Sequence, residues 1–158
     1  MPHDSTPKTR PVRRVMSCLT DVVAEGPLRV GYRSPLRTAE CSYALVRELL
    51  EGRATEEFWS ILLDARNRAI GLAQISVGCL TWSVVHPREV YGPAVRMGAG
   101  AIIVAHNHPS GDSEPSAQDV EITQRLARAG ELHGIPLLDH LVCGHGSYVS
   151  LRTRGVLK

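Results

Sequence analysis

The segment HNHPSGDSEPSAQD carries two histidines, a serine and an aspartate at spacings that suit a metal site. His106 and His108 follow the apolar run Ala101–Ala105, which predicts a buried strand. Because successive side chains of a strand point to opposite faces, residues two apart share a face, and both imidazoles should point the same way. The two histidines are therefore candidate metal ligands.

Ser116 and Asp119 lie further along the same segment. Their spacing of three residues places both side chains on one face of a helix that begins after Pro115. Asp119 would add an oxygen ligand to the two imidazole nitrogens. Two nitrogens and one oxygen suit Zn²⁺ and leave its fourth position for water, the arrangement of a hydrolytic site. The expected cofactor is one zinc ion per chain.

Each half of this pattern also has a structural explanation. Ser116 and Asp119 form an S-x-x-D sequence at a helix start, and such a pair can cap a helix without binding a metal. The two histidines alone could equally be polar residues at the end of a strand. All four residues together favour the metal site, and Ser116 could cap the helix and serve the site as well.

The periodicity of apolar residues places this segment within an order of helices and strands. Apolar residues at helical spacing predict helices at residues 38–50, 87–98 and 117–132. Short apolar runs predict strands at residues 56–64, 69–78, 82–85, 101–105, 135–143 and 147–151. The first two strands flank the polar turn ARNR and should form a hairpin. The sequence therefore predicts an α/β fold.

Residues at the predicted helix ends support these boundaries. Thr38 can cap the first helix, Pro87 suits the first turn of the second, and Ser116 can cap the third. The apolar face of the second helix is predicted to consist of Val90, Ala94, Val95 and Met97.

Length and composition fit one catalytic domain. The chain has 158 residues, of which 43% are hydrophobic and 22% charged, enough for one filled core. No apolar run approaches the ~20 residues that span a bilayer, and the N-terminus lacks an apolar segment of signal-peptide type, which predicts a cytoplasmic protein without membrane contact. The cysteines show no CxxC spacing and are expected to be reduced: Cys18, Cys41, Cys79 and Cys143.

The net charge is +2, and much of the positive excess lies near the N-terminus. The basic residues there are Lys8, Arg10, Arg13, Arg14, Arg29, Arg33 and Arg37. They predict a basic, flexible extension at residues 1–33, ahead of a domain at residues 34–158. Such an arm could contact nucleic acid, but no aromatic stacking platform accompanies it.

Four segments together resemble a known family: EEFWSILLDARNR, VVHPREVYGPAVRMGA, AIIVAHNHPSGDSEPSAQDVEITQRL and LLDHLVCGHGSYVSL. From about Thr38 to the C-terminus, the chain resembles the JAB/MPN metalloprotease-like (JAMM) domains, most closely their bacterial RadC-like branch. The resemblance implies a single JAB/MPN domain, with a mixed, mostly antiparallel β-sheet flanked by helices in a cytidine-deaminase-like architecture.

The resemblance also implies roles for the polar residues of the motif. His106, His108 and Asp119 match the family's metal ligands, and Ser116 matches the hydroxyl that stabilises the reacting oxyanion. The pair Asp139-His140, in the segment LLDHLVC, is expected to approach the metal loop, where it could contact a zinc-binding imidazole from behind.

The family's general acid/base is a carboxylate on a strand, and two adjacent glutamates compete for that role. Glu57 directly precedes Phe58 in an EF pair that resembles the start of the family's strand, and it is the preferred candidate. Glu56 is the alternative. Strand alternation allows only one of the two to face the site but does not say which one.

The resemblance implies a zinc-dependent hydrolase of metallopeptidase or isopeptidase type, acting on a peptide or protein. The alternative is a non-catalytic, zinc-containing binding module with a role associated with DNA repair. A zinc deaminase is excluded, because that class requires an H-x-E sequence and a later P-C-x-x-C sequence. Neither is present here.

Overall fold

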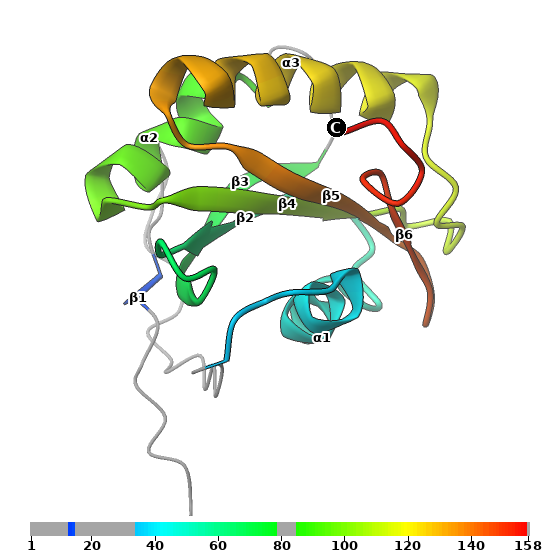
Figure 1. Cartoon of the computed structure of the whole chain (residues 1–158). Helices are drawn as coiled ribbons and strands as arrows, with labels where there is room; N and C mark the ends of the chain where they lie inside the picture. The colour runs from blue at the N-terminus through cyan, green and yellow to red at the C-terminus, as the bar shows by residue number, and fades with distance from the viewer. Residues whose placement is uncertain (1–12, 15–33, 79–84, 158) are drawn as a thin grey trace, which may run out of the picture.

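A β-sheet with helices on both faces makes up the described part of the chain (Figure 1). The computed structural model describes residues 13–14, 34–78 and 85–157. Helix α1 (Ala39–Leu50) covers one face of the sheet, and helices α2 (Pro87–Met97) and α3 (Ala117–His133) cover the other. The sheet is therefore the middle of three layers.

Two of the five strand pairings described in the sheet are parallel. From one edge to the other, the strands are β1 (Arg13–Arg14), β3 (Ala69–Gly78), β2 (Glu56–Leu63), β4 (Ala101–Asn107), β5 (Leu137–Cys143) and β6 (Tyr148–Ser150). Strand β1 runs parallel to β3 and β4 runs parallel to β5, while the other pairings are antiparallel. The predicted mixed, mostly antiparallel sheet flanked by helices is confirmed.

The helices begin and end where the sequence predicts. The Thr38 side chain accepts a hydrogen bond from the Cys41 N–H at the start of α1. Helix α2 starts at Pro87 and is followed by Gly98, whose φ of 63° suits glycine. The predicted boundaries of all three helices and of strands β2 to β6 agree with the structure to within two residues.

One predicted apolar position of α2 is wrong. Val95 is 55% exposed, whereas Val90 and Ala94 are fully buried. Val95 follows Val90 by five residues, and at about 100° per residue its side chain points about 140° away from that of Val90. The buried face of α2 is correspondingly narrower than the sequence predicts.

Several predictions concern residues outside the described ranges. The predicted strand at residues 82–85 falls there for the most part, as do the basic extension and two cysteines, Cys18 and Cys79. Cys41 and Cys143 are free, and burial raises the pKa of the Cys143 thiol to about 12. None of the described helices is long and apolar enough to cross a bilayer.

Alternation along the strands divides the core into two parts. On β2, Trp59, Ile61 and Leu63 pack with the residues of α1. Phe58 and Leu62 pack on the opposite face, with the residues of α2 and α3. A side chain on β2 therefore meets one of two different environments according to whether its number is odd or even.

Candidate metal centre

The two histidines of the motif come together at the end of β4. His106 lies on β4 and is fully buried. His108 follows the strand, and its N–H donates to the Cys143 carbonyl at 2.9 Å. The Nε2 atoms of the two imidazoles are 3.1 Å apart. Both rings therefore point the same way, as their spacing predicts.

Asp119, near the start of α3, faces both imidazoles. Its Oδ1 atom is 3.2 Å from His106 Nε2, and its Oδ2 atom is 3.4 Å from His108 Nε2. In tetrahedral coordination with bonds of about 2.0–2.1 Å, ligand atoms lie about 3.3 Å apart. The spacing of these two nitrogens and the carboxylate therefore fits a small ion such as Zn²⁺.

The cap of α3 aims the Asp119 carboxylate at the histidines. Ser116 Oγ accepts a hydrogen bond from the Asp119 N–H at 3.1 Å, while the Ser116 N–H donates to Asp119 Oδ2 at 2.7 Å. This is a capping box. The capping explanation and the metal explanation of S-x-x-D are thus compatible, because the cap itself orients the carboxylate.

The surroundings of Asp119 also favour its charged form. Burial by itself would raise the pKa of this carboxyl group, but the neighbouring His106 and the hydrogen bonds from Ser116 outweigh burial. The pKa therefore lies well below its ordinary value. An ionised carboxylate beside two imidazoles is suited to holding a cation.

Glu56 is the second carboxylate at this centre. Its Oε1 atom is 4.0 Å from His108 Nε2. Glu56, His106 and His108 each offer one ligand atom, all within 4.8 Å of one another, so that this group could hold a metal ion. The side chains of Glu56 and His108 are 24% and 18% exposed, which leaves this side of the centre open to solvent.

Glu57 lies on the other face of the sheet. Its Oε2 atom accepts hydrogen bonds from Trp59 Nε1 at 3.0 Å and from Gln74 Nε2 at 2.9 Å. Its Oε1 atom is 3.7 Å from Arg53 Nε. The structure therefore does not bring Glu57 to the histidines, and the preference for Glu57 over Glu56 is corrected.

The strand register explains this correction. Phe58 on β2 pairs with His106 on β4 in an antiparallel ladder, so the two side chains share a face. Glu56 is two residues from Phe58 and lies on that same face, whereas Glu57 shares its face with Trp59. The signal missing from the sequence was the register between β2 and β4.

Asn107, between the two histidines, ties this part of β2 to β4. Its side-chain Oδ1 atom accepts from the Glu57 N–H at 2.7 Å, and its Nδ2 atom donates to the Thr55 carbonyl at 3.0 Å. These two backbone groups flank Glu56. The amide of Asn107 thus holds the backbone of Glu56 beside the two imidazoles.

Comparisons with known proteins identify the family of this domain. A family model described as the RadC-like JAB domain matches residues 36–156. The chain belongs to this family. The earlier resemblance to RadC-like JAB domains is thereby confirmed, and the candidate metal centre lies inside the matched region.

Individual relatives give the same result. The chain is 48% identical over 133 residues to a UPF0758 protein of Syntrophotalea carbinolica, and 49% identical over 138 residues to one of Symbiobacterium thermophilum. The alignments cover 83% and 82% of this chain but 57% and 59% of those relatives. The chain therefore spans little more than half the length of these relatives.

The loop after β4 in this JAB domain packs tightly on the turn between β5 and β6. A Cβ atom on Gly144 would lie 2.2 Å from the Gly111 carbonyl oxygen, so only glycine allows this approach. The His145 N–H donates to that same carbonyl at 2.9 Å.

His108 Nδ1 donates to the Asp112 carbonyl within the loop at 2.8 Å, so its Nε2 atom carries no proton in the neutral ring.

His140 on β5 contacts the centre from behind, as expected. Its Nε2 atom is 2.8 Å from His106 Nδ1, and its Nδ1 atom is 2.6 Å from Thr123 Oγ1. Burial lowers the pKa of His140 well below its ordinary value, and the neighbouring His106 lowers it further. The adjacent Asp139 instead accepts from Ser150 Oγ at 2.7 Å.

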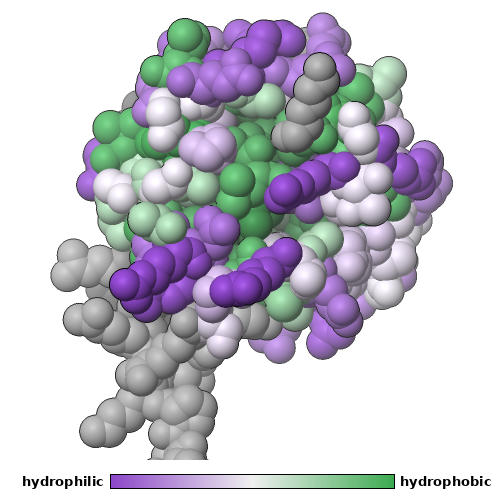
Figure 2. Space-filling view, in the orientation of Figure 1, coloured by the Kyte–Doolittle hydropathy of each residue, from purple (hydrophilic) through white to green (hydrophobic). Residues whose placement is uncertain are grey.

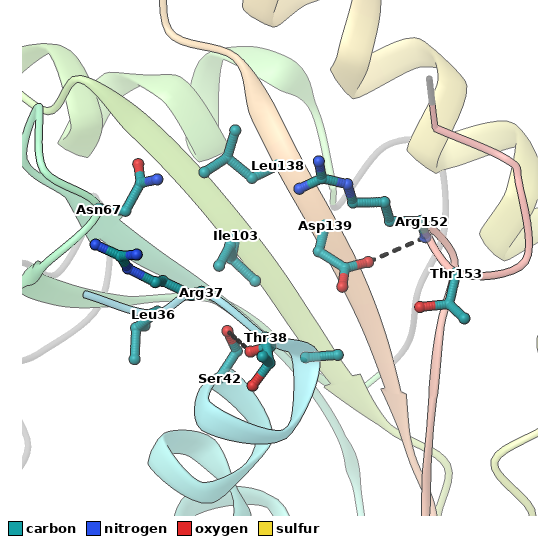
Figure 3. A pocket seen from close by; sticks show the side chains of 11 residues that line it. Leu36, Arg37, Thr38, Ser42, Asn67, Ile103, Leu138, Asp139, Arg152 and Thr153 are labelled. Atoms are coloured by element: carbon teal, nitrogen blue, oxygen red, sulfur yellow. Dashed lines mark hydrogen bonds between the residues drawn. The ribbon is translucent and has the colours of Figure 1, made fainter. Parts of the chain in front are cut away.

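A cavity of about 660 Å³ lies on the other side of the sheet, beside the start of α1 (Figure 3). Arg37 and Arg152 stand on either side of Ile103 and Leu138 there. The space-filling view shows apolar surface ringed by hydrophilic side chains on the face that contains β4, β5 and α1 (Figure 2). Ile103 packs toward α1, so the sheet separates this cavity from the histidines.

Proposed function

We propose that the chain is a zinc-dependent hydrolase of metallopeptidase or isopeptidase type that acts on a peptide or protein. The observation that carries this proposal is the convergence of His106, His108 and Asp119, with Glu56 4.0 Å from His108 Nε2. Membership of the JAB family supports it, since the spacing of these residues matches the family's metal motif.

Zinc bound by His106, His108 and Asp119 would lower the pKa of a water molecule to about 7. Glu56 is the general acid/base in this proposal, in place of Glu57. Its side chain is partly exposed on the open side of the centre, where it can accept a proton from water and deliver it to the departing amine. The buried Glu57 is held by Trp59 and Gln74 on the far face.

Ser116 would stabilise the negative oxygen of the tetrahedral intermediate. Its hydroxyl group donates to Asp119 Oδ2 at 2.7 Å, beside the ligand atoms. Rotation about the Cβ–Oγ bond would turn this hydrogen toward a substrate while Oγ continues to cap α3. Removal of one such donor typically raises the barrier by about 2.7–4 kcal/mol.

The open side of the centre favours a catalytic zinc ion over a structural one. Structural zinc sites are closed by four protein ligands, whereas catalytic sites use three and keep one position open. Three ligands converge here, and both Glu56 and His108 are accessible to solvent. The alternative role in nucleic-acid binding concerns residues 1–33 and stays a prediction.

Metal analysis of the purified chain tests the ligand assignment. We expect about one zinc per chain in the wild-type protein, and loss of that zinc in His106→Ala and Asp119→Asn, because each change removes one of three ligands. His133→Ala is the matched control, since His133 stacks on Tyr91 at the other end of α3 and should leave zinc binding unchanged. Stoichiometric zinc in both ligand variants would contradict the assignment.

A further inference from the structure

A chain of buried hydrogen bonds leads from α3 through β5 to the back of His106. Thr123 Oγ1 is 2.6 Å from the Asp119 carbonyl oxygen and 2.6 Å from His140 Nδ1. The other nitrogen of His140, Nε2, is 2.8 Å from His106 Nδ1. Thr123, His140 and His106 are all fully buried, so water does not compete for these groups.

The contact between Thr123 and the Asp119 carbonyl determines which group donates in each of the following hydrogen bonds. A carbonyl oxygen only accepts hydrogen bonds, so the single hydroxyl hydrogen of Thr123 points at Asp119. Thr123 Oγ1 must then accept its second hydrogen bond, which places a proton on His140 Nδ1. A fully buried imidazole with only a hydroxyl and another imidazole as ring partners is neutral, so His140 Nε2 has a lone pair.

The contact between His140 and His106 fixes a proton on the candidate ligand as well. His140 Nε2 accepts a hydrogen bond, and its partner at 2.8 Å is His106 Nδ1, which must therefore carry the proton. A neutral imidazole that binds a metal through one ring nitrogen carries its proton on the other. The Nε2 atom of His106 is therefore the nitrogen available to a metal, and it lies 3.1 Å from His108 Nε2 and 3.2 Å from Asp119 Oδ1.

We infer that His140 and Thr123 are positioning residues that hold His106 in the tautomer whose Nε2 atom is free to bind zinc. The inference rests on the proposed function for the identity of the ligand, and it assigns two residues that never touch the metal. Without these hydrogen bonds, a neutral His106 could place its proton on Nε2 and donate it to Asp119. Zinc would then have to displace that proton before binding.

This series of hydrogen bonds also couples two candidate ligands, Asp119 and His106, to each other. It starts at the backbone carbonyl of Asp119 and ends at the ring of His106, while the Asp119 carboxylate faces the other side of that ring. A shift of α3 would therefore disturb Asp119 and the proton position of His106 together. Partners of this kind, which hold a ligand without binding the metal, typically change metal affinity about 10- to 100-fold when removed.

Nitrogen NMR of the metal-free chain at about pH 8, where ordinary histidines are neutral, tests the tautomer directly. We expect His106 and His140 of the wild-type protein both to carry the proton on Nδ1. Thr123→Val keeps the shape of the side chain but removes the hydroxyl group, so it should release His140 and produce a mixture of tautomers at His106. Thr123→Ser keeps the hydroxyl group and should restore the wild-type spectrum.

Zinc affinity measured on the same proteins gives the second readout. We expect Thr123→Val to bind zinc about 10- to 100-fold more weakly than the wild-type chain, and Thr123→Ser to bind it with nearly wild-type affinity. Thr153→Val makes the same chemical change at an exposed position and serves as the control.

Some outcomes of these experiments would contradict the role of His140 and Thr123, and another would contradict the proposed function. A metal-free wild-type chain in which His106 carries no proton on Nδ1 would overturn the inference without any use of zinc. Wild-type zinc affinity in a folded Thr123→Val variant would overturn it as well. A wild-type chain with the expected tautomers that binds no zinc would instead overturn the proposed function.

Discussion

Two adjacent glutamates at the start of β2, Glu56 and Glu57, have different surroundings. Glu56 lies beside the candidate ligands with a partly exposed side chain, while Glu57 is buried on the opposite face with Trp59 and Gln74. One step along a strand exchanges the two faces of the sheet. The side chain that could move a proton is therefore chosen by the strand register, which Asn107 helps to hold.

Asn107→Ala should destabilise the chain because it removes both hydrogen bonds between this side chain and the backbone on either side of Glu56. The buried Glu57 N–H would lose its acceptor, which typically costs about 1–3 kcal/mol. We expect a decrease of that size in the free energy of unfolding of the metal-free chain, measured with urea.

Ser110→Ala is the control for that measurement. Ser110 lies in the loop beyond the motif histidines, and among the described residues its hydroxyl makes just one hydrogen bond, a long one of 3.4 Å accepted from the Asp112 N–H. We expect its free energy of unfolding to stay within about 0.5 kcal/mol of the wild-type value. If Asn107→Ala were equally harmless, Asn107 would not be holding β2 in place.

At the level of elements, the β2–β3 hairpin depends on one carboxylate. Asp64 Oδ1 accepts hydrogen bonds from the N–H groups of Arg66 and Arg68 at 2.8 and 2.9 Å, and Oδ2 lies 2.7 Å from the Arg68 guanidinium. Burial would raise the pKa of Asp64, but its hydrogen bonds with Arg68 and Arg66 lower it below the ordinary value. The charged form of Asp64 therefore stabilises the hairpin.

Asp64→Asn should weaken the fold in a pH-dependent way. Asparagine keeps the acceptor for the two backbone N–H groups but loses the charge pair with the partly exposed Arg68, so we expect a loss of about 1 kcal/mol at pH 7. Because the folded pKa is depressed, this stabilisation is present above the unfolded pKa of about 3.9 and is lost as the pH falls through the folded pKa.

The measurement is urea unfolding of wild type and Asp64→Asn at a series of pH values from about 7 to about 3. The difference between the two proteins should shrink toward acid pH. Glu131→Gln, at an exposed position on α3, is the control and should match the wild type throughout. A difference that stays constant from neutral to acid pH would rule out the charge of Asp64 as its cause.

At the scale of the whole molecule, the patterns that depend on local chain geometry predicted most of the fold. Thr38, Pro87 and Ser116 mark their helix starts through capping and backbone preferences, which neighbouring residues decide. The pairing of His106 with His108 followed from the period of a strand. Each of these predictions needed only a few residues in sequence.

The features that the sequence did not reveal depend on contacts between distant segments. The choice of Glu56 over Glu57 required the register of β2 against β4, and the path from Thr123 through His140 to His106 required α3 and β5 to meet behind β4. Only the three-dimensional arrangement of the sheet and α3 brings these groups together. The resemblance pointed to the pair Asp139-His140, of which only His140 contacts the centre, and not to Thr123.

We propose that this JAB domain uses Glu56 to hydrolyse a peptide or isopeptide bond at the His106, His108 and Asp119 centre. A single experiment compares Glu56→Gln and Glu57→Gln with the wild-type chain. The zinc-loaded proteins are incubated with an unbiased library of peptides and isopeptides, cleavage is followed by mass spectrometry, and zinc content is measured on the same samples.

We expect the wild-type chain to cleave part of the library, Glu56→Gln to retain about one zinc while losing at least about 100-fold in rate, and Glu57→Gln to retain both zinc and cleavage. A wild-type chain that holds zinc and cleaves nothing would contradict the hydrolase. Cleavage at the wild-type rate by Glu56→Gln would contradict the assignment of Glu56 as the general acid/base.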